Sequence, residues 1–383
     1  MRHARIVLTV LPLCLAGLLA ACGGGDGSGS GGSGSGEYGT GLELGKTIST
    51  APVDATVEPW YLWNNSTCSF ETTKDHPKAY KADLREVTGG DSQLGYMHYG
   101  NTDPFGVSNS KSIEEAAEKA EMPLDVYNLK FPSRTEPLAN ARTAVVKGDK
   151  GVIQANLDST ILPSFYEVLE GDGCIPSLQL YIPLEDHPAF GNHWPDVGTA
   201  IGEYIAEEAQ ARKWAPEDTA LVQCTDPSSG PSVDVMFDTL PEAVSASGFK
   251  IPKENIFDLV CKVEENQSGY RQVTDWYTAH PEFEHVAMSA VDTLRLPNMI
   301  RAAERQGAPR EDYISGAGAD EELSQKLLRE GKQDVSISFL GERFGEYAVP
   351  LMQDMMAGNP VPSFVGTELI PLTQDNIDQY YPE

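Results

Sequence analysis

Basic residues are scarce in this chain. Its 383 residues contain 28 lysines and arginines against 57 aspartates and glutamates, which gives a formal net charge of −29 at pH 7. The acidic residues are spread along the chain without long runs. No basic face can be assembled from this composition to neutralise phosphates, so nucleic acid is excluded as a partner.

Several catalytic and metal-binding motifs are also absent. The sequence has no HExxH, no GxSxG and no CxxC. The motifs that would indicate a metallopeptidase, a serine hydrolase or a zinc ribbon are therefore missing. The stretch GTGLELGKT at 39–47 is similar to a phosphate-binding loop, but Thr40 stands where that signature needs its first glycine. One loop could gather a metal through Glu185, Asp186, His187 and His193. No second histidine lies at helical spacing there, so we predict no metal and no cofactor.

Long apolar runs are confined to the start of the chain. Basic residues at 2–5 precede an apolar run at 6–19, which is too short for a membrane span and typical of a signal peptide. The run ends in Leu-Ala-Ala-Cys, which resembles the lipobox of bacterial lipoproteins. We therefore expect a signal peptide at 1–21 and lipid on Cys22. The alternative is an ordinary secretory signal.

A flexible tether follows this cysteine. Residues 23–36 are almost all glycine and serine, and such a linker behaves as a coil of roughly 20 Å end to end. We assign 22–45 to the lipidated cysteine and its tether. The tether would hold a globular body of about 345 residues near a membrane, enough for two domains.

Cysteine is rare outside the leader. Four cysteines remain after Cys14 and Cys22: Cys68, Cys174, Cys224 and Cys261. An even number in an exported chain favours two disulfides, for which three connectivities exist. We favour Cys68 with Cys174 and Cys224 with Cys261, because the last two end consecutive strand-like runs at 219–224 and 255–261.

Residues 46–91 form an extension with no clean periodicity. It contains Trp60, Tyr61 and Trp63, which could stack on a sugar. In a segment tied down by Cys68, packing of these rings against the body is the favoured interpretation.

From residue 92 onward, short apolar runs alternate with longer amphipathic stretches. Strands are expected at 93–99, 124–129, 151–156, 177–184, 219–224, 255–261, 284–291, 312–318 and 334–340. Helices are expected at 112–121, 137–148, 196–212, 236–247, 270–280, 299–307, 321–331 and 344–358. Ser112 and Glu115 have the spacing of a capping box at the first of these helices. The alternation predicts an α/β fold of two doubly wound lobes with parallel sheets, which bind ligands at the carboxyl ends of their strands.

Several segments together resemble one known family. The stretches at 102–120, 202–209, 278–307 and 365–383 look like those of the ribose-type solute-binding proteins of bacterial ABC transporters. The resemblance implies a type I periplasmic binding protein fold whose lobes are joined by a three-strand hinge. It also implies a first lobe of 92–191 with 341–366 and a second of 192–340 with 367–383. A monomer that closes on its ligand and docks on an ABC permease would follow.

The resemblance also implies a set of ligand-binding residues. Phe105 matches an aromatic of the family, whereas Glu185 and Asp186 stand for its Asp-Arg pair, Gly318 for an aspartate and Phe339 for the hinge glutamine. The resulting candidates are Asp103, Phe105, Asn156, Glu185, Asp186, Trp194, Asp234, Asp292 and Phe339. This acidic set suits a neutral sugar or polyol, or a ligand that carries an amine, and repels anions. The alternative role for each acid is to cap the following helix, foremost for Asp103.

These observations predict a non-enzymatic, extracytoplasmic solute-binding protein, anchored to the cell membrane by its lipidated cysteine, that delivers a small polar molecule to an ABC importer. Two alternatives stay open. One is a ligand sensor of the same fold that presents its ligand to a membrane receptor. The other is an exported enzyme that uses the acidic residues as general acid and base.

Overall fold

The computed structural model describes residues 59–78, 80, 82–86, 92–99, 104–129, 135–156, 160–182, 185–227, 231–262, 267–318 and 322–383. All of them lie in one compact unit, Tyr38–Glu383. Cys22, the tether and Asp103 fall outside these ranges, so the predictions made for them stay predictions. Among the described helices, none combines the length and apolar character that a membrane crossing needs.

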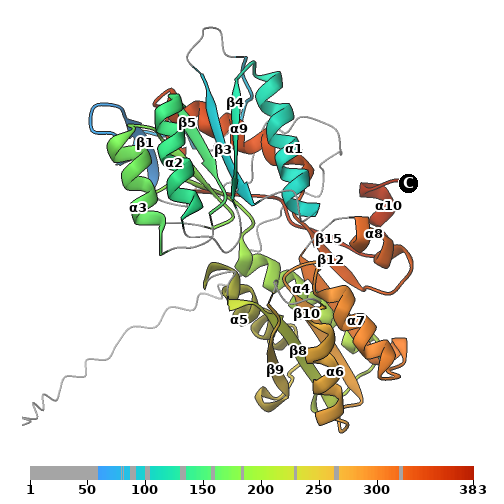
Figure 1. Cartoon of the computed structure of the whole chain (residues 1–383). Helices are drawn as coiled ribbons and strands as arrows, with labels where there is room; N and C mark the ends of the chain where they lie inside the picture. The colour runs from blue at the N-terminus through green and yellow to red at the C-terminus, as the bar shows by residue number, and fades with distance from the viewer. Residues whose placement is uncertain are drawn as a thin grey trace, which may run out of the picture. The chain divides into compact units, whose positions relative to one another are not determined.

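The first lobe is built on a parallel six-stranded sheet in the order β14-β7-β6-β5-β3-β4. Its strands are β3 (Leu94–Tyr99), β4 (Leu124–Leu129), β5 (Gly151–Gln154), β6 (Ser177–Leu180), β7 (Ala189–Gly191) and β14 (Phe364–Gly366). Strands β3, β4 and β5 of this sheet are labelled in Figure 1. Helices α1 (Pro104–Lys119) and α9 (Phe344–Met356) share one core with Tyr96 and Ile153. Helices α2 (Glu136–Lys147) and α3 (Leu162–Tyr166) share another core with Met97 of β3 and Val152 of β5, which are adjacent in sequence to Tyr96 and Ile153. Because side chains alternate along a strand, both faces of this sheet are covered.

The second lobe has its own six-stranded sheet, in the order β15-β12-β11-β10-β8-β9. The strands are β8 (Thr219–Thr225), β9 (Ile256–Val260), β10 (His285–Ala290), β11 (Tyr313–Gly318), β12 (Val335–Ser338) and β15 (Ile370–Leu372), and only β15 is antiparallel to its neighbour. Helices α4 (Trp194–Ala211) and α5 (Pro231–Ala246) pack with Leu221 and Ala287, whereas α6 (Tyr270–Ala279) and α7 (Leu296–Arg305) pack with Val222 and Met288. Two short helices, α8 (Glu322–Arg329) and α10 (Ile377–Tyr380), complete the lobe.

The predicted strands and helices from residue 92 onward are confirmed as elements of this fold, as is the α/β class with two parallel-sheet lobes. The capping box at Ser112 is wrong, because α1 begins eight residues earlier, at Pro104. Ser112 is buried inside the helix, where its hydroxyl accepts a hydrogen bond of 2.9 Å from the Gly345 amide of α9. The hydroxyl thus joins two helices instead of starting one.

The chain passes between the two sheets three times: after β7, after β12 and after β14. The first and third passages are hydrogen-bonded to each other. The Thr367 hydroxyl donates to Asn192 Oδ1 over 2.8 Å, and the Thr367 amide donates to the Gly191 carbonyl over 2.9 Å. On the third passage, burial raises the pKa of the Glu368 carboxyl to about 6, and the nearby Arg343 of the second passage lowers it in part.

The extension forms an antiparallel hairpin of β1 (Trp60–Asn64) and β2 (Ser69–Thr73), and β1 also pairs with β13 (Val361–Pro362). Trp60, Tyr61 and Trp63 are 0%, 4% and 3% exposed, which confirms that the rings pack against the body. Further along, the Tyr80 hydroxyl donates to Asp354 Oδ2 of α9 over 2.9 Å. The extension is therefore part of the first lobe's core.

Both favoured disulfides are confirmed. Cys68, at the turn of the hairpin, is bonded to Cys174 just after the π-helical segment η1 (Glu167–Asp172). Cys224 is bonded to Cys261, and this pair joins the neighbouring strands β8 and β9 at their carboxyl ends.

Candidate functional site

The carboxyl edge of the first sheet presents Asn156 after β5 and Tyr181 after β6. Asn156 is 1% exposed, and its peptide is held from both sides. Its amide donates to Gln154 Oε1 over 2.8 Å, and its carbonyl accepts from Gln179 Nε2 over 3.1 Å. The two glutamines are hydrogen-bonded to each other and to the Tyr166 hydroxyl. This buried network fixes the backbone at the edge where parallel α/β sheets bind ligands.

An aromatic cluster joins this edge to the second lobe. Its members are Phe105, Tyr181, Trp194, Phe339 and Phe344. Phe105 lies 5.8 Å from Tyr181 and 5.6 Å from Phe339, ring centre to ring centre. Trp194 lies 5.5 Å from Phe339, and its indole N–H donates to the Tyr181 carbonyl over 3.0 Å. The structure thus brings together three of the predicted residues: Phe105, Trp194 and Phe339.

Gly318 belongs to the same neighbourhood. It ends β11, and a Cβ at this position would lie 2.2 Å from the ring of Phe339. No side chain fits there while the ring keeps its place. Gly318 and Phe339 therefore depend on each other in packing.

The carboxyl edge of the second sheet carries a buried ion cluster. Arg295, 2% exposed, pairs with Asp226 after β8 and with Asp292 after β10, and its Nε donates to the Cys261 carbonyl over 2.8 Å. Asp292 also accepts hydrogen bonds from the amides of Leu294 and Arg295 at 3.0 and 3.2 Å. Both amides belong to the turn that precedes α7, and the N-cap of α7, Arg295, makes no side-chain capping hydrogen bond, so Asp292 orders this turn and does not cap the helix. A quarter of its side chain stays exposed, so it can also contact a ligand.

Asp234 lies in the first turn of α5, close to the same cluster. Burial raises the pKa of its carboxyl, and the neighbouring Asp238 and Asp226 raise it further. Asp226, Asp234 and Asp292 thus outnumber Arg295 in this cluster. Sequence reasoning missed both Arg295 and Asp226. The spacing of Asp292 and Arg295, three residues apart at the start of a helix, was the available signal.

Glu185 and Asp186 are placed differently from the other candidates. Both are exposed in the loop between β6 and β7, and the Asp186 main chain is hydrogen-bonded to the Tyr61 hydroxyl of β1. The positions directly after β6 are instead Tyr181 and Ile182. Their neighbour His187 stacks on Tyr166 and lies 3.2 Å from Glu170. Among the described residues, no group of three or more potential metal ligands is present.

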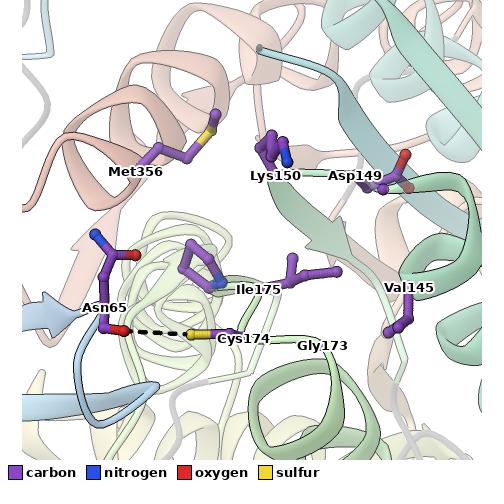
Figure 2. A pocket seen from close by; sticks show the side chains of 10 residues that line it. Asn65, Val145, Asp149, Lys150, Gly173, Cys174, Ile175 and Met356 are labelled. Atoms are coloured by element: carbon purple, nitrogen blue, oxygen red, sulfur yellow. Dashed lines mark hydrogen bonds between the residues drawn. The ribbon is translucent and has the colours of Figure 1, made fainter.

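Two cavities lie away from the carboxyl edges. One, of about 520 Å³, is at the amino-terminal ends of β5 and β6 and is shown in Figure 2. The other, of about 490 Å³, is at the amino-terminal ends of β11 and β12. It contains Asp334, held by Arg212 and Arg310 at 2.6 and 2.8 Å. Neither cavity is lined by a predicted ligand-binding residue.

Comparison with known proteins agrees with this architecture. No protein-family model matches the sequence. The chain is 28% identical over 140 residues to the "ABC transporter L-arabinose-binding periplasmic protein" of Azospirillum brasilense, a match that spans 36% of this chain and 41% of that protein. A solute-binding protein from Actinobacillus succinogenes with bound D-allose superposes with a TM-score of 0.64 at 14% identity, over 76% of this chain and 100% of the other.

The same fold is found outside transport. A putative LacI transcriptional regulator from Bacteroides fragilis superposes with a TM-score of 0.63 at 14% identity, over 76% of this chain and 100% of the other. These similarities, together with the sheet topology, show that the chain has the type I periplasmic binding protein fold. The resemblance read from the sequence is confirmed at the level of the fold.

Proposed function

We propose that this protein is an extracytoplasmic solute-binding protein that captures a sugar or polyol between its lobes and delivers it to an ABC importer. One observation carries the proposal: two parallel-sheet lobes, linked by three passages of the chain, carry an aromatic cluster at one carboxyl edge and an acidic cluster at the other. The A. brasilense relative and the allose-bound neighbour support this class of ligand.

The two edges offer complementary chemistry to a sugar. Phe105 and Trp194 supply ring faces and edges for the apolar face of a pyranose or cyclitol. The Asn156 side-chain amide, the Tyr181 hydroxyl and the Asp292 carboxylate supply hydrogen bonds for its hydroxyls. Since acids outnumber Arg295 at the second edge, a neutral ligand or one with an amine is favoured over a phosphorylated one.

Hinge closure is the proposed mechanism. A ligand that contacts both edges at once binds the closed form more tightly, and this differential affinity shifts the equilibrium between open and closed forms. Residues 92–191 with 341–366 would move as one lobe and 192–340 with 367–383 as the other. The ABC permease would bind the closed form of a monomer.

The proposal includes a membrane anchor. Lipid on Cys22 and the tether at 22–45 would hold the body close to the permease. No catalytic role is assigned to the acidic residues. A ligand sensor that signals to a membrane receptor is the second candidate, because the B. fragilis regulator shares the fold.

Isothermal titration of the full chain tests the ligand class. The ligands are L-arabinose, D-allose, myo-inositol, D-glucosamine and D-ribose 5-phosphate. We expect a neutral or aminated ligand to bind and the phosphate ester not to bind. Phe105→Ala and Asp292→Asn should each weaken binding about tenfold or more, or ~1.4 kcal/mol.

Val107→Ala is the matched control, because Val107 is 44% exposed on the same helix as Phe105. It should bind like the wild type. Unchanged affinity in both site variants, with normal folding, would place the ligand elsewhere. Binding of the phosphate ester alone would reject the ligand class.

A further inference from the structure

The two disulfides of this protein lie in different surroundings. Cys224 and Cys261 are both 0% exposed, whereas Cys68 and Cys174 are both partly exposed. Exchange with a thiol requires access to sulfur, and exposed disulfides are the labile ones. We propose that the Cys68–Cys174 bond is an exchange site for small thiols and that the Cys224–Cys261 bond is inert. This proposal is independent of the function proposed above.

The exchange site has an entrance. Cys174 lines the cavity of about 520 Å³ at the amino-terminal edge of the first sheet, together with Asn65, Lys150 and Gly173 (Figure 2). Cys68 is not among the lining residues. A small thiol in this cavity therefore meets Cys174 Sγ first.

The Asn65 carbonyl oxygen lies 3.6 Å from Cys174 Sγ and 3.7 Å from Cys68 Sγ; Figure 2 marks the first of these with a dashed line. A disulfide sulfur carries no hydrogen, so these are oxygen–sulfur contacts. Once the bond opens, each sulfur can become a thiol that donates to this same oxygen. The Asn65 carbonyl in the hairpin turn can thus accept a hydrogen bond from a cysteine thiol after the disulfide has opened.

The backbone at both cysteines is strained. Cys68 has φ 51° and Cys174 has φ 53°, in the left-handed region that favours glycine. Cys68 closes the β1–β2 turn, and Cys174 follows η1, with its amide donating to the Glu170 carbonyl over 3.0 Å. These conformations are held by backbone hydrogen bonds of the turn and of the end of η1 as well as by the disulfide.

Opening this bond leaves the extension in place. Trp60 and Trp63 stay buried, and β1 keeps its pairing with β13. Trp60 also stacks on His76 with ring centres 4.4 Å apart. The exchange therefore takes place in the folded protein and loosens only the tip of the hairpin, residues 65–68.

The chemistry is a balanced displacement. A thiolate attacks Cys174 Sγ, a new sulfur–sulfur bond forms, the Cys68–Cys174 bond breaks, and Cys68 leaves as a thiolate that takes a proton from water. The product carries the small thiol on Cys174 and a free thiol on Cys68. The cavity has two charged lining residues, Lys150, which is exposed, and Asp149, which is 2% exposed. Because the exposed charge is the cation, an anionic thiol such as glutathione should react faster than a neutral one of equal thiol pKa.

Peptide mass spectrometry tests the proposal. The folded, non-reduced full chain is incubated with glutathione, or with 2-mercaptoethanol as the neutral thiol, and free thiols are then alkylated. We expect glutathione on Cys174, alkylation on Cys68 and an intact Cys224–Cys261 bond, with at least a tenfold difference in rate between the two disulfides. Lys150→Gln should slow glutathione severalfold and leave 2-mercaptoethanol unchanged.

Lys147→Gln is the matched control for charge, because Lys147 lies near the same loop but does not line the cavity. It should leave both rates unchanged. Equal rates at the two disulfides would overturn the proposal, as would glutathione on Cys68 instead of Cys174. The Cys68→Ser/Cys174→Ser double variant should stay folded by circular dichroism, and its loss of fold would contradict exchange in the native state.

Discussion

Arg295 shows how one side chain organises an edge of a sheet. It is buried with two carboxylates, one of which, Asp226, is itself 1% exposed. Desolvating these charges is costly, and the cost is offset only while each has its partner. Sequence patterns cannot show this arrangement, because Asp226 and Arg295 meet only through the pairing of β8 with β10.

Removing this arginine should destabilise the protein strongly. Arg295→Met leaves Asp226 as an unpaired buried charge, so we expect the free energy of unfolding in urea to fall by about 3–5 kcal/mol. Arg301→Met is the control, since Arg301 is exposed on the same helix and should change stability by less than about 1 kcal/mol. An equal decrease in the free energy of unfolding in the two variants would show that the buried ion cluster contributes no more than a surface arginine.

Asp149 gives a prediction on pH. Burial raises the pKa of its carboxyl to about 6, while the Tyr127 hydroxyl donates to Oδ2 over 2.7 Å. The folded pKa lies above the unfolded value of about 3.9, so the folded state binds more protons between these values. Stability from this group is present below about pH 4 and is lost as the pH rises through 6.

Asp149→Asn should remove this dependence. Urea midpoints at pH 4, 5, 6 and 7 should fall less steeply in the variant, which should be more stable than the wild type at pH 7 by about 1–2 kcal/mol. Parallel pH profiles for the two proteins would refute this assignment.

At the scale of elements, periodic segments could be predicted and aperiodic ones could not. The strand at 151–154 is buried on both faces and is apolar up to Gln154, so its position in a parallel sheet follows from sequence. The β1–β2 hairpin has no such pattern, and its pairing with β13 joins residues some three hundred positions apart in the chain. The start of α1 was predicted wrongly because Ser112 and Glu115 have the spacing of a capping box but lie in the interior of a helix that begins at Pro104.

The α4–α5 contact depends on glycine. A Cβ at Gly198 would lie 2.2 Å from the Met236 carbonyl oxygen, so the backbones must separate to accept it. We expect Gly198→Ala to lower stability by about 1–3 kcal/mol in thermal unfolding followed by circular dichroism.

Gly171→Ala is the control for helix propensity, because the nearest atom to its Cβ, apart from its chain neighbours and the backbone of its own helix, would be Glu167 Cγ at 3.9 Å. It should leave stability unchanged or slightly raised. A neutral Gly198→Ala would mean that α4 and α5 are less closely packed than described.

At the scale of the whole molecule, the class of fold could be predicted but the site only in part. Phe105, Trp194 and Phe339, three of the candidate residues, are in contact in the structure. Glu185 and Asp186 were displaced by a few residues, because the loop after β6 is longer than the pattern assumed and Tyr181 takes the edge position. Loop lengths are set by packing that no single sequence displays.

The central claim is that the two lobes bind a sugar or polyol. Thermal unfolding of the full chain with increasing concentrations of neutral sugars, polyols, amino sugars and amino acids tests it most directly, because a specific ligand must raise the melting temperature by mass action. The account predicts a concentration-dependent rise with at least one neutral or aminated sugar or polyol, and a smaller rise for Phe105→Ala. A rise with amino acids alone would contradict it.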